Sequence, residues 1–274
     1  MLLVICAALP VRAAEGPAKA TPSATPAVPA VDPGAVSAVD RMGDYLKTLR
    51  AFAVHAETTT DEILLGGAKI QYQGSFDLTV RWPDRMRVSF ERDGRNPQEF
   101  FYDGTSVTVW IKARNMWASV PAPGTIPALI EMMHAKYGMP MPLEDLLLDA
   151  AKKQILERVT AGVVIGPSRV AGVECEHYGF HQKDVDWQIW IPKGDSPLPR
   201  KFLVTTLGEP TQPQHSEVLT WDLSPKLDDA MFTFVPPAGA EKIVFAEAPR
   251  PPGGKRTVTP ATPQASTAKK EGSP

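Results

Sequence analysis

The stretch from Ile70 to Trp82 reads IQYQGSFDLTVRW, and its alternation of apolar and polar residues decides the fold. One set of alternate positions holds Ile70, Tyr72, Gly74, Phe76, Leu78, Val80 and Trp82, and the other holds Gln71, Gln73, Ser75, Asp77, Thr79 and Arg81. A period of two over this length predicts a β-strand with one dry face and one wet face. The strand is longer than usual, so we expect it to curve or bulge, with Gly74 as the natural position. Long curved antiparallel strands wrap around something apolar, which favours a half-barrel with a hydrophobic concavity.

The segments on either side extend this pattern into a sheet. A first helix is predicted over Ala35–Leu49, where apolar residues recur at helical spacing. Strands are predicted before the middle of the chain at Ala51–Thr60, Ala68–Trp82, Met86–Arg92, Glu99–Tyr102, Ser106–Lys112 and Met116–Val120. Strands are predicted after it at Ala161–Ile165, Arg169–Gln182, Val185–Ile191, Lys201–Leu207, Ser216–Leu223 and Met231–Phe234. Turn signals such as Asp103-Gly104 separate neighbouring strands, which indicates antiparallel pairing.

Two helices are predicted between these groups of strands. The segment TIPALIEMMHAKY, from Thr125 to Tyr137, places Ile126, Leu129, Ile130 and Met133 on one face, with Glu131 and Lys136 on the other. A second helix is predicted over Leu143–Leu156. The open concave face of the sheet is the natural docking place for both. The predicted fold class is therefore α+β: an unclosed antiparallel β half-barrel with a helical lid over a hydrophobic concavity.

The ends of the chain differ in composition from this core. Residues 1–14 contain a short apolar run followed by Val11-Arg12-Ala13, which predicts a secretory signal peptide. Residues 15–34 are rich in Ala, Pro and Thr and are expected to form a flexible tether, and residues 247–274 a mildly basic disordered tail. The folded domain is expected over residues 35–246. Removal of the signal would also remove Cys6, leaving Cys175 without an intramolecular disulfide partner.

No motif in the sequence supports catalysis or nucleic-acid binding. The formal net charge is −2, and neither a basic helix nor a nucleic-acid motif is present. A G-x-S-x-G elbow, a Walker loop, H-E-x-x-H and the Rossmann glycines are all missing. Cys175, His177 and His181 share one strand face, but residues of equal parity stand about 7 Å apart, too far to converge on a metal alone. We therefore predict a protein without enzymatic activity, cofactor or metal; an alternative, a metal-dependent enzyme using His177 and His181, would require stoichiometric metal.

Four segments resemble one protein family. They are VRWPDRMRVSF (Val80 to Phe90), FFYDGTSVTVWIKARNMWASV (Phe100 to Val120), WQIWIPKGDSPLPRKFLVTT (Trp187 to Thr206) and FTFVPPAGAEKI (Phe232 to Ile243). In order and spacing they resemble the LolA/LolB superfamily of periplasmic lipoprotein carriers, most closely its uncharacterised branch of predicted periplasmic proteins. The resemblance covers about Val36 to Ile243, and the long Pro-rich tether and basic tail depart from LolA itself.

The resemblance implies a periplasmic protein whose half-barrel cavity takes a lipid or an acyl chain of a lipoprotein, with an envelope protein as a further possible partner and no membrane-integral part. The implied cavity-lining residues are Tyr72, Phe76, Leu78, Val80, Trp82, Met86, Val88, Phe90, Ile126, Leu129, Ile130, Met133 and Trp187. The residues alone are equally consistent with a dry core, because every sheet must bury one face. The alternative is thus a structural or interaction module of the envelope with a filled barrel. A lipid site should enclose an apolar space of a few hundred Å³, on the order of known ligand pockets.

Overall fold

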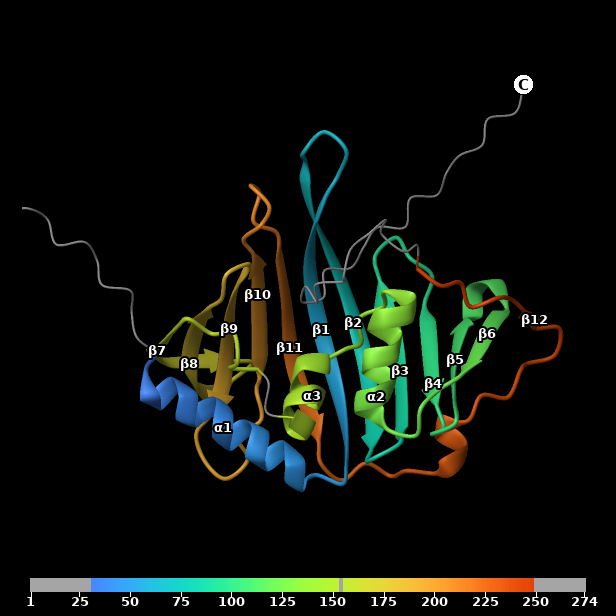
Figure 1. The fold of residues 1–274 in the computed structure, drawn as a ribbon, viewed down its shortest axis with the longest axis horizontal. Helices are drawn as coiled ribbons and strands as arrows, with labels where there is room; N and C mark the ends of the chain where they lie inside the picture. The colour runs from blue at the N-terminus through green and yellow to red at the C-terminus, as the bar shows by residue number, and fades with distance from the viewer. Residues whose placement is uncertain (1–30, 153–154, 249–274) are drawn as a thin grey trace, which may run out of the picture.

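A computed structural model describes residues 31–152 and 155–248 of the chain (Figure 1). The predicted signal peptide, most of the predicted tether and nearly all of the predicted tail lie outside the described residues. The described chain forms one 12-stranded sheet with helices packed on one of its faces. The predicted fold class, an α+β unclosed antiparallel half-barrel with a helical lid, is confirmed.

Up to β11 (Gln214–Asp222), the helices and strands follow one another in the predicted order. The helices are α1 (Pro33–Thr48), α2 (Ile126–Met132), its π-helical continuation η2 (Met133–Tyr137) and α3 (Glu144–Lys152), with short 3₁₀ turns η1 (Lys112–Arg114) and η3 (Asp229–Phe232). The first strands are β1 (Ala51–Ile63), β2 (Lys69–Arg81), β3 (Arg85–Arg92), β4 (Gln98–Tyr102), β5 (Ser106–Ile111) and β6 (Met116–Pro121). The later strands are β7 (Ala161–Val170), β8 (Val173–His181), β9 (Val185–Pro192), β10 (Lys201–Thr206), β11 (Gln214–Asp222) and β12 (Glu241–Lys242).

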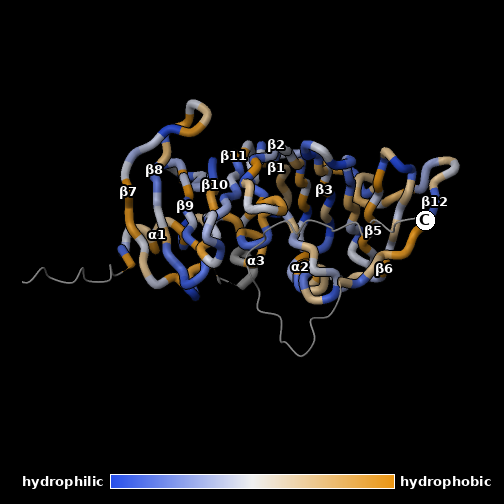
Figure 2. The backbone as a smooth tube through the Cα atoms, turned by 90° about the horizontal axis from the view of Figure 1, so that it is seen from above, coloured by the Kyte–Doolittle hydropathy of each residue, from blue (hydrophilic) through white to orange (hydrophobic). Residues whose placement is uncertain are grey.

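Two antiparallel meanders meet at the centre of the sheet. The strand order is β12-β6-β5-β4-β3-β2-β1-β11-β10-β9-β8-β7, so β1 joins the meander of β1–β6 to that of β7–β11 through its pairing with β11. All neighbours are antiparallel except β12 and β6, which are parallel. Seen from above, the strands form a curved row and α2 and α3 lie on one side of it (Figure 2). The sheet remains open, with β7 and β12 at its two edges.

Alternation along β1 and β2 builds the core as predicted. Cross-strand pairing aligns Phe52 with Val80 and Val54 with Leu78, and each of these side chains is at most 1% exposed. These residues and the matching positions of the neighbouring strands form the concave face of the sheet. Helix α1 covers one end of that face with five buried side chains: Ala35, Ala38, Val39, Met42 and Leu46. Asp32 caps α1 by accepting a hydrogen bond from the Gly34 amide at 2.7 Å, and Pro33 occupies its first turn.

The long strand differs from the prediction in two respects. Its register with β1 is continuous through Gly74 and its pairing with β3 begins there, so of the two expected alternatives, a curve or a bulge, the bulge is not there; a register shift lies instead in β7, between Val164 and Gly166. The dry face is also shorter than predicted, because Ile70 is 39% exposed and Tyr72 is half-buried. This end of β2 projects beyond the neighbouring strands in a hairpin with β1, where no helix covers it (Figure 1).

Two of the predicted strands are also corrected. The strand predicted over Arg169–Gln182 crosses a turn, because β7 continues to Val170 and β8 begins at Val173. The strand predicted over Met231–Phe234 is wrong: residues 229–232 form the 3₁₀ turn η3, and the closing strand β12 is only Glu241–Lys242. Phe234 instead packs its ring against Phe101, Trp110 and Trp117 on the outer face of the sheet, at centroid distances of 5.3, 5.8 and 5.5 Å. The aromatic pattern predicts a strand here, but the Phe234 ring instead attaches an irregular segment to the sheet.

Within the described residues, no helix has both the length and the apolarity needed to span a membrane.

Gly74 is required by the close approach of its neighbours in the sheet. A Cβ atom at this position would lie 2.7 Å from the Glu91 carbonyl oxygen and 2.9 Å from the Thr58 hydroxyl. We expect Gly74→Ala to lower the free energy of unfolding by about 1–3 kcal/mol, because the backbone must shift to admit the methyl group. Urea denaturation measures the effect. Gly208→Ala is the matched control, since a Cβ there meets nothing within 4 Å, and an equal loss in both variants would contradict the steric explanation.

Candidate functional site

The concave face of the sheet is covered by a lid made of α2, η2 and α3. The four side chains predicted to point inward, Ile126, Leu129, Ile130 and Met133, are all fully buried, whereas Glu131 and Lys136 are exposed. Thr125 caps α2 by accepting a hydrogen bond from the Ala128 amide at 3.4 Å. The helical period therefore places an apolar stripe of the lid on the apolar face of the sheet.

Polar contacts tie the pieces of the lid to one another. The carboxylate of Glu144, at the start of α3, accepts a hydrogen bond from the Met141 amide at 2.8 Å and lies 2.5 Å from Nε2 of His134 in η2. Glu144 is only 6% exposed, so these partners replace the water that its carboxylate loses. The contact joins η2 to α3 and makes α2, η2 and α3 a connected unit.

The start of the lid is hydrogen-bonded to the sheet end. The Ile126 amide donates to the Pro83 carbonyl at 2.9 Å, and the Tyr102 hydroxyl donates to the Pro123 carbonyl. Burial raises the pKa of Tyr102 to about 12, with the nearby Asp84 charge acting in the same direction. The phenol therefore stays a donor at physiological pH.

The end of η2 is held by the last described residues, 243–248, which we call the C-terminal strap. The strap follows β12 along the sheet edge, and the Phe245 ring then packs on Tyr137 of η2 with centroids 4.6 Å apart. The Ala248 amide donates to the Lys136 carbonyl at 3.2 Å, and Glu247 lies 3.2 Å from the Lys136 ammonium group. The ion pair is exposed and adds little by itself, so the aromatic contact is the main attachment.

An apolar pocket lies at the seam between the lid, α1 and the sheet. Its volume is about 10 Å³, and its lining consists of Leu46, Phe52, Trp82, Leu143, Leu146, Leu147 and Trp221. A space of this size holds about one water molecule. Leu143 has a left-handed backbone with φ of 51°, a conformation that costs a non-glycine residue roughly 1–2 kcal/mol. Strain of this kind often marks functional positions.

The residues predicted to line a cavity fall into three groups. Ten of them are buried in one continuous core: Phe76, Leu78, Val80, Met86, Val88, Ile126, Leu129, Ile130, Met133 and Trp187. Trp82 and Phe90 are partly buried against that core, and Trp82 alone of the predicted set lines the pocket. Tyr72 lies apart, with the Arg92 guanidinium 4.5 Å from its ring centroid. The predicted cavity-lining set does not contain the other pocket residues. Phe52 could have been found, because the alternation of apolar and polar residues that marks β2 also holds in β1.

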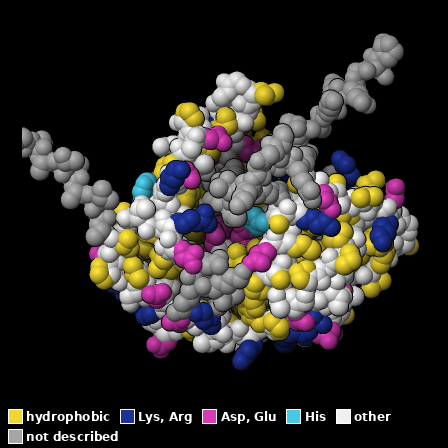
Figure 3. Space-filling model, in the orientation of Figure 1, with side chains coloured by type: hydrophobic (Ala, Val, Ile, Leu, Met, Phe, Trp, Pro, Cys, Tyr) yellow, Lys and Arg dark blue, Asp and Glu magenta, His cyan; other side chains and the backbone are white. Residues whose placement is uncertain are grey.

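Beyond the apolar core, the concave face becomes polar. His215 of β11 joins the Thr60 hydroxyl at 2.8 Å to the Glu217 carboxylate at 3.0 Å. On the opposite face of the same strands, Asp61 is 6% exposed and pairs with Lys69 at 3.1 Å, and the Gln71 side-chain amide donates to it. Figure 3 shows acidic, basic and histidine side chains gathered near the middle of the concave face, with hydrophobic side chains around them. The acid pair Glu144–Asp145 in the first turn of α3 lies beside this polar region, close enough for the charge of Glu217 to act on Asp145.

Asp145 has an unusual environment. Its side chain reaches solvent, yet the surrounding protein still desolvates the carboxyl group. Burial, followed by the negative charge of Glu144, raises the pKa of Asp145 to about 6. The group therefore titrates close to neutral pH at the point where the lid meets the polar region.

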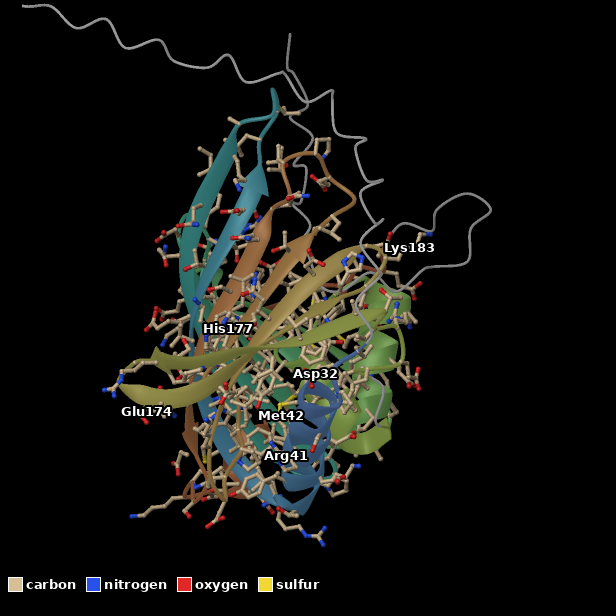
Figure 4. The ribbon with its side chains drawn as sticks, turned by 90° about the vertical axis from the view of Figure 1, so that its left-hand side faces the viewer. Asp32, Arg41, Met42, Glu174, His177 and Lys183 are labelled. Atoms are coloured by element: carbon tan, nitrogen blue, oxygen red, sulfur yellow. The ribbon has the colours of Figure 1, made fainter. Side chains whose placement is uncertain are left out.

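The outer-face histidines have structural partners. His177 stacks on Trp190 with ring centroids 3.9 Å apart and lies 2.9 Å from the Gln188 side chain, and burial lowers its pKa. His181 lies 2.6 Å from the Asp186 carboxylate. Figure 4 shows strand β8, which carries Glu174 and His177, beside helix α1 with Met42. Among residues 31–152 and 155–248, no group of three or more His, Cys, Asp or Glu side chains could hold a metal ion.

A family model described as "Predicted periplasmic protein (DUF2092)" matches residues 35–246 of the chain. These are the limits predicted for the folded domain. The match agrees with the predicted resemblance to a branch of predicted periplasmic proteins. A search of curated protein sequences found no match.

Several solved structures are similar to the chain. The lipoprotein LppX from Mycobacterium tuberculosis is 15% identical, with 72% of this chain and 100% of that chain covered and a TM-score of 0.47. MucB in the Pseudomonas aeruginosa MucA/MucB complex is 16% identical, with 73% and 61% covered and a TM-score of 0.40. The LolA superfamily protein NE2245 from Nitrosomonas europaea is 11% identical, with 73% and 97% covered and a TM-score of 0.33. These scores are too low to support an argument about function.

The strap contact predicts a specific change in lid dynamics. We expect Phe245→Ala to increase amide hydrogen exchange in α2 and η2, because the aromatic contact that holds Tyr137 is lost. An increase of roughly tenfold corresponds to about 1.4 kcal/mol of lost local stability. Exchange in the centre of β2 serves as the internal control. Equal changes in the lid and β2 would mean that the strap stabilises the whole domain rather than the lid.

Asp145 predicts a pH dependence of stability. Its pKa is raised in the folded state from the usual 3.8 to about 6, so its contribution to stability is present below about pH 4 and is lost as the pH rises through about 6. Asp145→Asn removes the titration. We therefore expect the free energy of unfolding of the wild type to fall relative to the variant across this interval, as measured by urea denaturation at several pH values. Parallel curves for the two proteins would show that Asp145 titrates normally.

Proposed function

The chain belongs to the DUF2092 family of predicted periplasmic proteins, and on this premise we propose that it binds a lipid, a lipoprotein acyl chain or a similar apolar ligand between sheet and lid. The protein acts as a binding protein and not as an enzyme in this proposal. The observation that carries it is the pocket at the lid seam, whose seven lining residues are all apolar.

The way the lid is attached supports an exchange of lid contacts for ligand contacts. Between Ile126 and Tyr137, the lid meets the sheet through buried apolar side chains such as Leu129, Ile130 and Met133. Apolar contact is non-directional and depends chiefly on the area removed from water. An acyl chain can therefore take the place of these side chains against the apolar face of the sheet.

The closed state leaves too little room for an acyl chain. The pocket of about 10 Å³ is far below the several hundred Å³ of an occupied ligand site. Binding in the proposed mode thus requires the lid to move away from the sheet. The strained backbone of Leu143, which lines the pocket at the start of α3, and the left-handed Gly138 after η2 are positions where the connection can change conformation.

The filled core also favours a second candidate function. A half-barrel whose concavity is closed by its own helices can serve as an interaction module of the envelope without any ligand. The ten predicted lining residues that lie in the continuous core fit this alternative as well. The two functions differ in whether purified protein takes up an apolar molecule, and native mass spectrometry of periplasmic protein tests that directly.

A substitution at Leu143 tests the proposed ligand site. Leu143→Gly removes a side chain from the pocket lining and so enlarges the space at the lid seam, and we expect the dissociation constant for dibrominated stearic acid to fall roughly tenfold, or about 1.4 kcal/mol. Binding is read from quenching of Trp82 and Trp221, which line the pocket, with Trp82→Phe and Trp221→Phe variants to assign the signal.

Leu143→Asn is the matched control for this experiment. Asparagine tolerates the left-handed backbone, so it gives similar strain relief but places a polar amide in the pocket. We expect it to weaken probe binding relative to Leu143→Gly. Absence of quenching in the wild type and in Leu143→Gly would reject the ligand site and leave the interaction module as the better account.

A further inference from the structure

The hairpin between β1 and β2 ends in an exposed apolar tip, residues 63–70, with the sequence ILLGGAKI. Leu65 is fully exposed, Leu64 is 43% exposed and Ile70 is 39% exposed. No charged residue occurs from Ile63 to Ala68. Figure 1 shows this hairpin projecting past the ends of the neighbouring strands. Figure 3 shows hydrophobic side chains on the same projection.

The tip is a formed turn. The Leu64 amide donates to the Ala68 carbonyl at 2.8 Å, and the Gly67 amide donates to the Leu64 carbonyl at 2.9 Å. Gly66 and Gly67 supply the positive φ angles of 94° and 84° that the reversal requires. Below the turn, Lys69 is held by Asp61, and the Arg92 guanidinium pairs with Glu62 at 2.6 Å. The two leucines are therefore presented on a hairpin whose base is fixed.

The size and composition of the tip favour a lipid surface over a protein partner. A stable protein interface buries about 1,200–2,000 Å² in total, and three apolar side chains at the end of a narrow hairpin present only a fraction of this area. A bilayer needs no complementary pocket, because any apolar side chain that enters its hydrocarbon region is removed from water. The uncharged turn can enter without carrying a desolvated charge, because Lys69 lies at its base and is paired there with Asp61.

We infer that the β1–β2 tip inserts Leu64 and Leu65 into the surface of a lipid bilayer and docks the protein there. The lining of the pocket includes Phe52, near the start of β1, whereas the tip follows the end of β1 at Ile63. A strand of 13 residues spans about 40 Å, so docking by the tip holds the lid seam away from the membrane surface. The inference does not depend on the proposed ligand.

Vesicle flotation of the full chain tests this inference. The wild type is mixed with phosphatidylcholine vesicles, and separately with vesicles containing phosphatidylglycerol, at low and at high salt. We expect it to float with both, with little loss at high salt, because the inserted residues 63–68 carry no charge whose attraction to the membrane ions could screen. We expect Leu64→Ser/Leu65→Ser to lower the bound fraction at least about tenfold, since the exposed apolar area at the tip is removed.

The matched control is Ile165→Ser/Val235→Ser, which removes two exposed aliphatic side chains, 54% and 78% exposed, from other parts of the surface. It should float like the wild type. The inference is overturned by a wild type that does not float, by unchanged flotation of the Leu64/Leu65 variant, or by binding that is lost entirely at high salt. It is also overturned if sedimentation without vesicles shows that the Leu64/Leu65 substitutions convert a dimer to a monomer, since the tip would then contact a second copy.

Discussion

The inner face of the β1–β2 pair has to be kept from water, and the rest of the structure follows from that requirement. Phe52, Val54, Leu78 and Val80 form the middle of this face and are at most 1% exposed. The sheet is open, so its own strands cannot enclose them as a closed barrel would. Helices must therefore cover these residues, and α1, α2 and α3 do so with their apolar stripes. The order of helix, strands, helices and strands in the chain is the order that this cover requires.

The cover is attached by two kinds of contact with different consequences. Directed contacts fix the start of α2, at Pro83 and Tyr102, and the end of η2, at the C-terminal strap. Between them, the buried side chains of Leu129, Ile130 and Met133 hold the lid by apolar contact with the core. Such contact stabilises the closed position of the lid without depending on fixed directions. The lid pieces are joined to one another through Glu144 and His134, which favours movement as a unit.

The concave face changes character along its length. Apolar packing fills the part under α1 and α2, and the part near Thr60, His215 and Glu217 is polar and internally hydrogen-bonded. Helix α3 begins where the two parts meet, with Leu143 turned into the apolar pocket and Asp145 reaching solvent beside the polar region. A ligand with an apolar chain and a polar end would find both environments along one face. The exposed hairpin tip lies beyond the polar part, outside the reach of any helix.

The sequence by itself determined the strand alternation, the order of the elements and the inward stripe of the lid, because these depend on local period and propensity. Ile126, Leu129, Ile130 and Met133 were placed correctly for that reason. Tertiary structure decided the features that arise where distant segments meet. Phe234 reads as a strand residue but packs across Trp110 and Trp117, and Ile70 has the right parity for the core but projects past the helices that would bury it. The pocket at Leu46, Trp82 and Trp221 combines segments far apart in the chain, and the volume left between them depends on packing that no local pattern encodes.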